Sequence, residues 1–95
     1  MAVSNYCIDS HCDIYRLNDN IVASGTVKTI TETGVVVAGT NMMTIETNTL
    51  IKISIRPESH PTEVYVGLVS SSTPELLAIV RIQRFKEFNK REYFR

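Results

Sequence analysis

The run Leu50–Arg56 constrains the fold of this chain more than any other stretch, because apolar and polar residues alternate in it without a break. Ile51, Ile53 and Ile55 occupy every second position, and polar or charged residues separate them. Successive side chains of a β-strand point to opposite faces, so this period of two predicts a strand that is buried on one side. The sequence therefore favours a β-sheet that covers a hydrophobic core.

Five other runs have strand character, and turn-forming residues such as Asn18–Asn20 and Pro57–Pro61 separate them. The six predicted strands are Cys12–Leu17, Ile21–Glu32, Val35–Ala38, Leu50–Arg56, Glu63–Val69 and Glu75–Ile82. The composition of the last run would also suit a short helix, but the regular spacing of strands and turns favours a sixth strand. Six strands without an intervening helical period predict an all-β fold with antiparallel connections.

Closure of these strands into a small barrel, complete or partly split, would remove the exposed edges of an open sheet. Gly25 and Gly67 lie inside predicted strands, where an isolated glycine marks a bulge or a sharp bend. From residue 39 to residue 49 the strand pattern stops. We expect an irregular loop there that crosses one end of the barrel and packs Met42, Met43 and Ile45.

Ninety-five residues suffice for one domain, and the basic residues are concentrated at its C-terminal end. The chain is neutral as a whole, with ten basic and ten acidic side chains. Residues 81–95, however, hold six of the basic and only two of the acidic ones, so this segment carries +4 and the first 80 residues carry −4. A basic segment of this kind is either a solvated linker or an anion-binding arm.

The residues that most often carry enzymatic or metal chemistry are few and poorly placed. Cys7, His11 and Cys12 lie close together, but with His60 as the one other histidine they lack the ligand spacing of a zinc site, and we expect reduced thiols, no metal and no cofactor. His11 and Cys12 are adjacent and would point to opposite faces of a strand, and no other catalytic motif is present, so an enzyme is not predicted.

The sequence also indicates the cellular compartment in which the protein is expected. Its first residues lack the basic and apolar regions of a secretory signal, and no apolar run approaches the roughly 18 residues of a membrane-spanning segment. We therefore expect a cytoplasmic protein without a membrane span.

Arg91 and Arg95 form the one pattern that suggests a specific ligand. A spacing of four places two side chains on the same side of the chain, with Cα atoms about 13 Å apart in a strand and about 6 Å apart in a helix. The guanidinium group binds phosphate oxygens or the O6/N7 edge of guanine through two parallel hydrogen bonds. An alternative is that Phe85 and Phe88 simply anchor the terminal segment to the barrel.

With these arginines, the heptapeptide Asn89–Arg95 resembles the start of a PilZ domain, the bacterial receptor module for cyclic di-GMP, whose first motif is R-x-x-x-R. The preceding barrel, with the strand Tyr65–Val69 and the tripeptide Gly25–Val27, resembles the six-stranded split barrel of the N-terminal domain of YcgR-type flagellar brake proteins. The resemblance implies a barrel domain over residues 1–88, followed by a basic linker and a truncated PilZ domain over residues 89–95.

The resemblance further implies a non-catalytic regulatory domain that controls flagellar motility through protein contacts. Arg91 and Arg95 would form half of a cyclic di-GMP site, and the partners would be that nucleotide, a downstream PilZ domain of the same protein and flagellar motor proteins. The second PilZ motif, D/N-x-S-x-x-G, does not occur in this sequence. The 95 residues alone are therefore expected to bind the nucleotide weakly or not at all.

Three other functions remain open at this stage. The first is a protein-interaction barrel that binds no nucleotide of its own. The second is a flavin-binding oxidoreductase, because split barrels also occur in that class. The third is an oligonucleotide-binding barrel, which the net charge of −4 over the first 80 residues and the lack of interleaved basic and aromatic residues disfavour.

Overall fold

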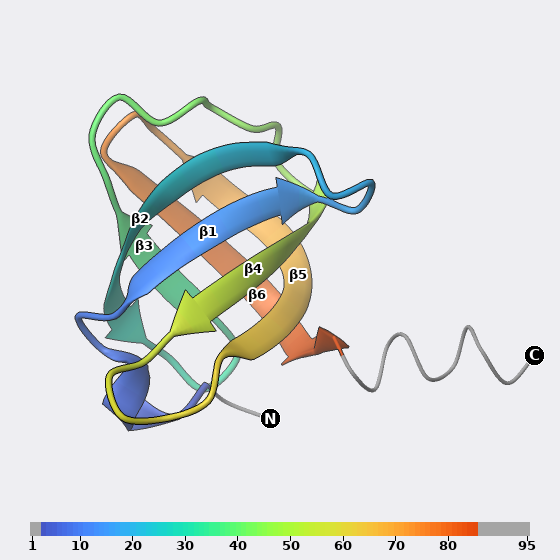
Figure 1. Ribbon diagram of the computed structural model, residues 1–95. Helices are drawn as coiled ribbons and strands as arrows, with labels where there is room; N and C mark the ends of the chain where they lie inside the picture. The colour runs from blue at the N-terminus through green and yellow to red at the C-terminus, as the bar shows by residue number, and fades with distance from the viewer. Residues whose placement is uncertain (1–2, 86–95) are drawn as a thin grey trace, which may run out of the picture.

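The computed structural model describes residues 3–85, and in this range every strand pairs with a neighbour on each side (Figure 1). A short 3-10 helix, η1 (Asn5–Cys7), precedes six strands. The strands are β1 (His11–Arg16), β2 (Ile21–Ile30), β3 (Val35–Ala38), β4 (Leu50–Arg56), β5 (Glu63–Ser72) and β6 (Leu76–Arg84).

The strands form a closed antiparallel barrel in the order β1-β2-β3-β6-β5-β4. The pairing of β1 with β4, in which Cys12 lies opposite Ile55 and Ile14 opposite Ile53, joins the two ends of the sheet. Closure satisfies the backbone donors and acceptors that an open sheet would leave at its edges. The prediction of an all-β, six-stranded antiparallel barrel is confirmed.

The alternation seen in the sequence matches the burial of the strands. In β4, Ile51, Ile53 and Ile55 are fully buried, while Lys52 and Ser54 are partly exposed. Strand β6 is extended rather than helical, with Leu77 and Ile79 in the core. All six strands contribute side chains to one interior cluster of mainly β-branched residues, and β1, β3 and β4 do so at every second position.

The connection between β3 and β4 crosses the upper end of the barrel in Figure 1. Its backbone is held by neighbouring segments: the Met42 amide donates to the Pro74 carbonyl at 2.9 Å, and the Asn48 amide donates to the Val69 carbonyl at 2.7 Å. Met42 and Ile45 are buried as expected, but Met43 is 56% exposed. The packing prediction was therefore wrong for Met43, which lies on the solvent side of the loop.

The lower end is closed by the segment before β1, which the sequence analysis did not recognise as structured. Val3 and Cys7 are buried beneath the barrel. The Asp9 amide donates to the Val27 carbonyl at 2.8 Å, and the Val27 amide donates to the Ser10 carbonyl at 2.9 Å. These bonds fix η1 and the chain that follows it against strand β2.

The turn expected at residues 70–74 begins later than predicted. Strand β5 continues through Ser72, which pairs with Leu77 of β6, after the register of the two strands shifts between Val69 and Ser71. The turn itself is tight, because the Thr73 hydroxyl accepts a hydrogen bond from the Leu76 amide at 3.0 Å. A β-bulge has thus carried the ladder across a serine-rich stretch that resembles a loop in sequence.

The two strand glycines lie in different surroundings. Gly67 lies where the pairing of β5 with β6 shifts register, between Val66 and Leu68. At Gly25 the neighbouring backbone approaches closely: a Cβ atom added there would lie 2.3 Å from the Ala38 carbonyl oxygen. Glycine is required at position 25 because a backbone atom occupies the space that a side chain would fill.

We predict that Gly25→Ala lowers the free energy of unfolding by about 1–3 kcal/mol or more, since strands β2 and β3 must move apart to admit the methyl group. Gly39→Ala is the matched control, because the atoms that an added Cβ would meet first belong to the flexible Met42 side chain. Chemical denaturation of the three proteins measures both effects. Equal losses of unfolding free energy in the two variants would show that the Ala38 backbone beside Gly25 can move aside to admit a methyl group.

Candidate functional site

Arg91 and Arg95, the predicted ligand-binding residues, lie outside the described residues, and so does Phe88. The described part of the chain ends at Phe85, directly after strand β6. What the structure shows is therefore the end of the barrel from which the chain continues toward the arginine pair. Three arrangements of polar side chains lie on or near this end.

The first arrangement is centred on Glu63, whose side chain is 93% buried at the start of strand β5 (7% exposed). The Tyr6 hydroxyl donates a hydrogen bond to Oε2 of this carboxylate, and the Tyr65 hydroxyl donates to Oε1 at 2.5 Å. Cys7 Sγ lies 3.8 Å from Oε1, and the Arg84 guanidinium lies 4.0 Å from the same oxygen. One carboxylate thus connects η1 with strands β5 and β6.

The ionised form of Glu63 is favoured in this environment. Burial alone would raise its pKa, but the hydrogen bonds from Tyr6 and Tyr65 and the positive charge of Arg84 outweigh burial, so that the pKa lies below its ordinary value. The carboxylate has the opposite effect on its donors. Burial, together with the hydrogen bond to Glu63, raises the pKa of Tyr65. The pKa of Tyr6 is also raised, mainly by the hydrogen bond that Tyr6 itself donates to Glu63.

The second arrangement surrounds Phe85 on the outside of the barrel. Two shallow hollows of about 340 and 370 Å³ lie beside it, and both are lined by Val64 and Phe85. The Lys52 ammonium lies 4.8 Å from the centroid of the Phe85 ring, and the Arg84 guanidinium lies 5.4 Å from that of Tyr65. Cations beside aromatic rings suit an anionic or planar ligand, but Lys52 already pairs with Asp19 and Arg84 with Glu63.

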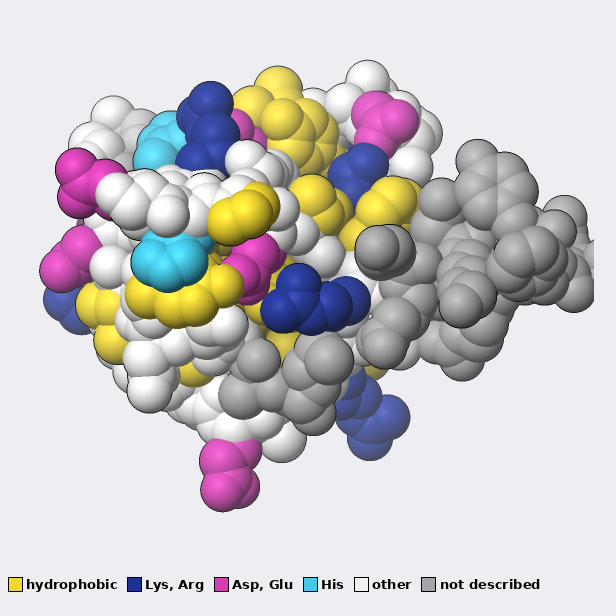
Figure 2. Space-filling model, turned by 60° about the horizontal axis from the view of Figure 1, so that its bottom comes forward, with side chains coloured by type: hydrophobic (Ala, Val, Ile, Leu, Met, Phe, Trp, Pro, Cys, Tyr) yellow, Lys and Arg dark blue, Asp and Glu magenta, His cyan; other side chains and the backbone are white. Residues whose placement is uncertain are grey.

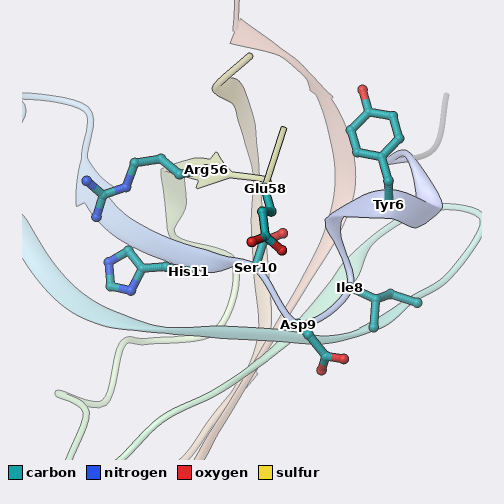
Figure 3. Close-up of a pocket in the computed structure, with 7 residues that line it drawn as sticks. All are labelled: Tyr6, Ile8, Asp9, Ser10, His11, Arg56 and Glu58. Carbon is teal, nitrogen blue, oxygen red and sulfur yellow. The ribbon is translucent and has the colours of Figure 1, made fainter. Parts of the chain in front are cut away.

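The third arrangement is a groove of about 570 Å³ between η1 and the adjoining ends of β1 and β4 (Figure 3). Its lining residues are Tyr6, Ile8, Asp9, Ser10, His11, Arg56 and Glu58. Figure 3 shows Tyr6 and Ile8 on one side of the groove, His11 and Arg56 on the other, and Glu58 between them. The groove therefore combines an apolar wall with charges of both signs.

The side chains of His11 and Arg56, on the same wall of the groove, share one carboxylate, that of Asp13. His11 and Arg56 are direct cross-strand partners. His11 Nε2 lies 3.0 Å from Oδ1 of Asp13, and an Arg56 nitrogen lies 3.3 Å from Oδ2. Burial raises the pKa of Asp13, but the hydrogen bonds from Ser24 and His11 and the charge of Arg56 exceed that effect and lower it overall.

On the opposite wall, the Tyr6 ring stacks on His60 with centroids 3.8 Å apart. Figure 2 shows the lower end of the molecule, where acidic and basic side chains are interspersed and neither forms a continuous patch. This mixture differs from the basic, aromatic-lined groove that binds single-stranded nucleic acids.

The cysteines and histidines do not form a reactive centre in the described structure. His11 is exposed and Cys12 is fully buried, as their adjacent positions on a strand predicted. Both thiols are free, and burial raises the pKa of Cys7 to about 11 and that of Cys12 to about 12. Such thiols are almost entirely protonated at neutral pH and are weak nucleophiles.

Among residues 3–85, no group of three or more His, Cys, Asp or Glu side chains is arranged to hold a metal ion. No helix in the same range has the length and apolar character that crossing a membrane requires. Comparisons of the chain with protein-family models, with curated proteins and with solved structures find no significant match.

The Glu63 network was missed by the sequence analysis, although one signal for it was present. Glu63 and Tyr65 are two residues apart on the same strand and share the interior face, so a carboxylate at position 63 breaks an otherwise apolar pattern. A buried carboxylate requires hydrogen-bond donors. Its remaining partners, Tyr6 and Arg84, are distant in sequence and could not be found from spacing.

We predict that acidification destabilises the native protein more than the Glu63→Gln variant. The pKa of Glu63 is lower in the folded than in the unfolded chain, so its contribution to stability is fully present above the unfolded value and is lost as the pH falls through the folded value. Unfolding free energies measured by denaturation between neutral and acidic pH test this, with exposed Glu46→Gln as the control. Parallel pH profiles for native and Glu63→Gln proteins would contradict the assigned role.

Proposed function

We propose that this chain is a non-catalytic regulatory domain of a cyclic di-GMP-responsive protein of the PilZ class. The observation that supports the proposal is a closed six-stranded barrel whose last strand, β6, is followed in sequence by an R-x-x-x-R motif. The resemblance to flagellar brake proteins rests on this combination of a six-stranded barrel domain with the arginine motif immediately after it. The domain would act in the cytoplasm by contact with other proteins.

In this proposal Arg91 and Arg95 supply half of the nucleotide site, and a downstream domain of the protein supplies the rest. Two guanidinium groups on one side of a chain can bind the phosphates and the guanine edges of a cyclic dinucleotide at the same time. The barrel has a supporting role, since Arg84, seven residues before Arg91, is held between Glu63 and the Tyr65 ring. Arg84 thereby anchors the end of β6 to the core.

The alternative is a barrel that serves protein contacts alone and binds no nucleotide. The paired charges of the barrel favour this alternative within residues 3–85, because each cation near the end of β6 has a carboxylate partner: Asp19 for Lys52 and Glu63 for Arg84. Binding of a nucleotide by the barrel itself would have to break these ion pairs. The two functions differ in whether the protein needs Arg91 and Arg95 in order to act.

We predict that the 95-residue chain binds cyclic di-GMP weakly or not at all, whereas a protein extended through a following PilZ domain binds it and loses binding on Arg91→Ala or Arg95→Ala. Each lost bidentate contact to a phosphate or guanine should cost roughly 1–3 kcal/mol, which weakens binding about five- to 150-fold. Isothermal titration calorimetry measures the affinities.

Arg81→Ala is the matched control, because Arg81 is an exposed arginine of strand β6 outside the motif. Its affinity should equal that of the native protein. Tight binding of the nucleotide by the 95-residue chain, or an equal loss in all three arginine variants, would refute the proposed division of the site. Absence of binding in the extended protein would favour the barrel that serves protein contacts alone.

A further inference from the structure

The last two described residues of the chain are held by groups on opposite sides of the barrel wall. Arg84 points toward the Glu63 network, where its guanidinium lies 4.0 Å from Oε1 of Glu63. Phe85 follows it on the outer side, where it lines two shallow hollows together with Val64. Successive residues of an extended chain point to opposite faces, so each of the two is held by a different group.

A β-bulge in β6 decides which face Phe85 occupies. Ile79 is buried and Phe85 lies six residues after it, so an unbroken strand would turn both side chains inward. The pairing of β6 with β5 instead changes register, and Arg81 and Ile82 share one partner position, that of Gly67. The alternation of faces therefore shifts by one residue, which leaves Phe85 on the outside.

The bulge is strained and firmly held. Arg81 has a φ of 55°, in the left-handed region that residues with a side chain seldom adopt. The Ile82 amide donates to the Thr33 carbonyl at 3.1 Å, so the turn between β2 and β3 fixes the bulge. Strain of this kind is typical of segments that aim a functional side chain. The direction of the residues that follow the bulge is therefore a candidate for function.

On the outer face, Lys52 of β4 lies between two aromatic rings. Its ammonium is 4.8 Å from the centroid of the Phe85 ring and 5.6 Å from that of the Tyr15 ring. Both distances lie within the range of about 6 Å over which a cation is attracted to an aromatic ring. The Lys52 side chain is only 15% exposed, and its charge is paired with Asp19. Partial removal from water strengthens the attraction to the rings.

We call Tyr15, Asp19, Lys52 and Phe85 the outer clamp. Tyr15 of β1 is the direct cross-strand partner of Lys52, and Asp19 belongs to the turn between β1 and β2. Lys52 is thus fixed from two sides before it contacts Phe85. The outer clamp joins the end of the described chain to strands that are distant from it in sequence.

We propose that Lys52 is a positioning residue for the arginine pair, because the outer clamp fixes the point from which residues 86–95 continue. Arg91 lies six residues after Phe85, and six residues span at most about 20 Å. Fixing Phe85 limits the volume that both guanidinium groups explore, so less conformational entropy is lost when they bind a cyclic dinucleotide. This inference rests on the proposed function of the arginine pair, whereas the outer clamp consists of described residues alone.

The outer clamp itself is poorly suited to bind a ligand. The Lys52 ammonium occupies the position between the two rings that an external cation would take. The Asp19 carboxylate neutralises the charge that would attract an anion. A role in holding Phe85 accounts for both contacts.

The first measurement tests the outer clamp in the 95-residue chain. Protons above the face of an aromatic ring resonate upfield, so the ε-methylene protons of Lys52 should lie upfield of those of exposed Lys28 in nuclear magnetic resonance spectra. Phe85→Leu keeps an apolar side chain but removes the ring, and it should move the Lys52 signals toward those of Lys28. Lys52 signals that Phe85→Leu leaves in place would show that the contact is not formed in solution and would refute the proposal.

The second measurement tests positioning, by calorimetry with cyclic di-GMP and the protein extended through a following PilZ domain. Lys52→Met removes the charge and should weaken binding roughly five- to thirtyfold, the equivalent of ordering one backbone residue. Lys52→Arg retains the charge and should restore most of the affinity. Lys28→Met is the matched control, because Lys28 is an exposed lysine of β2, and it should leave the affinity unchanged. The thermal unfolding midpoint of each variant shows whether the fold is retained.

A double variant separates positioning from direct contact with the nucleotide. If Lys52 acts through Phe85, then Lys52→Met combined with Phe85→Leu should bind no more weakly than Phe85→Leu alone. Losses that multiply in the double variant would mean that Lys52 acts by another route, which is contrary to the proposal.

The remaining outcomes distinguish this inference from the proposed function. An extended protein that loses binding on Arg91→Ala but not on Lys52→Met would exclude the positioning role and leave the proposed function intact. Equal losses in Lys52→Met and Lys28→Met would also exclude it, because any lysine would then have the same effect. Absence of binding by the native extended protein would refute the proposed function, and the positioning role with it.

Discussion

The pairing of β1 with β4 is the interaction on which the rest of the structure depends, because it closes a six-stranded sheet into a barrel. The whole of β1 lies beside β4, from His11 opposite Arg56 to Arg16 opposite Ile51. Without this ladder both would be edge strands with unpaired backbone groups, and the isoleucines that face inward would be open to water. Closure also confines function to the ends of the barrel and its outer face, since side chains fill the interior.

The two ends are closed by different chemistry. At the upper end the loop between β3 and β4 inserts Met42 and Ile45, so that end is sealed mainly by apolar contacts and by backbone hydrogen bonds. At the lower end a buried carboxylate, Glu63, is satisfied by two tyrosine hydroxyls and a guanidinium. A polar seal has stricter geometry than an apolar one, because an unmade hydrogen bond to a buried charge is costly. The lower end therefore specifies how η1 and the end of β6 are positioned.

The sequence predicted the fold well but not the polar network around Glu63, for a physical reason. Period-two alternation, as at Ile51, Ile53 and Ile55, reports local burial directly, so strand existence and the all-β class followed from it. Register and bulges did not, because the shift between Val69 and Ser71 depends on the partner strand. Glu63, Tyr6 and Arg84 meet only after the barrel has closed. Strand order could not be derived from the sequence either, so contacts between neighbouring strands could not be predicted.

Strand β6 is the last described element before the arginine pair in the sequence. Arg84, at its end, belongs to the Glu63 network. The residues before Arg84 are held on both sides, since Ile82 is buried and its amide donates to the Thr33 carbonyl at 3.1 Å, while Gln83 pairs with Val66. Energetic coupling between two sites requires an element with two discrete arrangements. A strand fixed in this way provides one arrangement, so the barrel should act as a rigid platform.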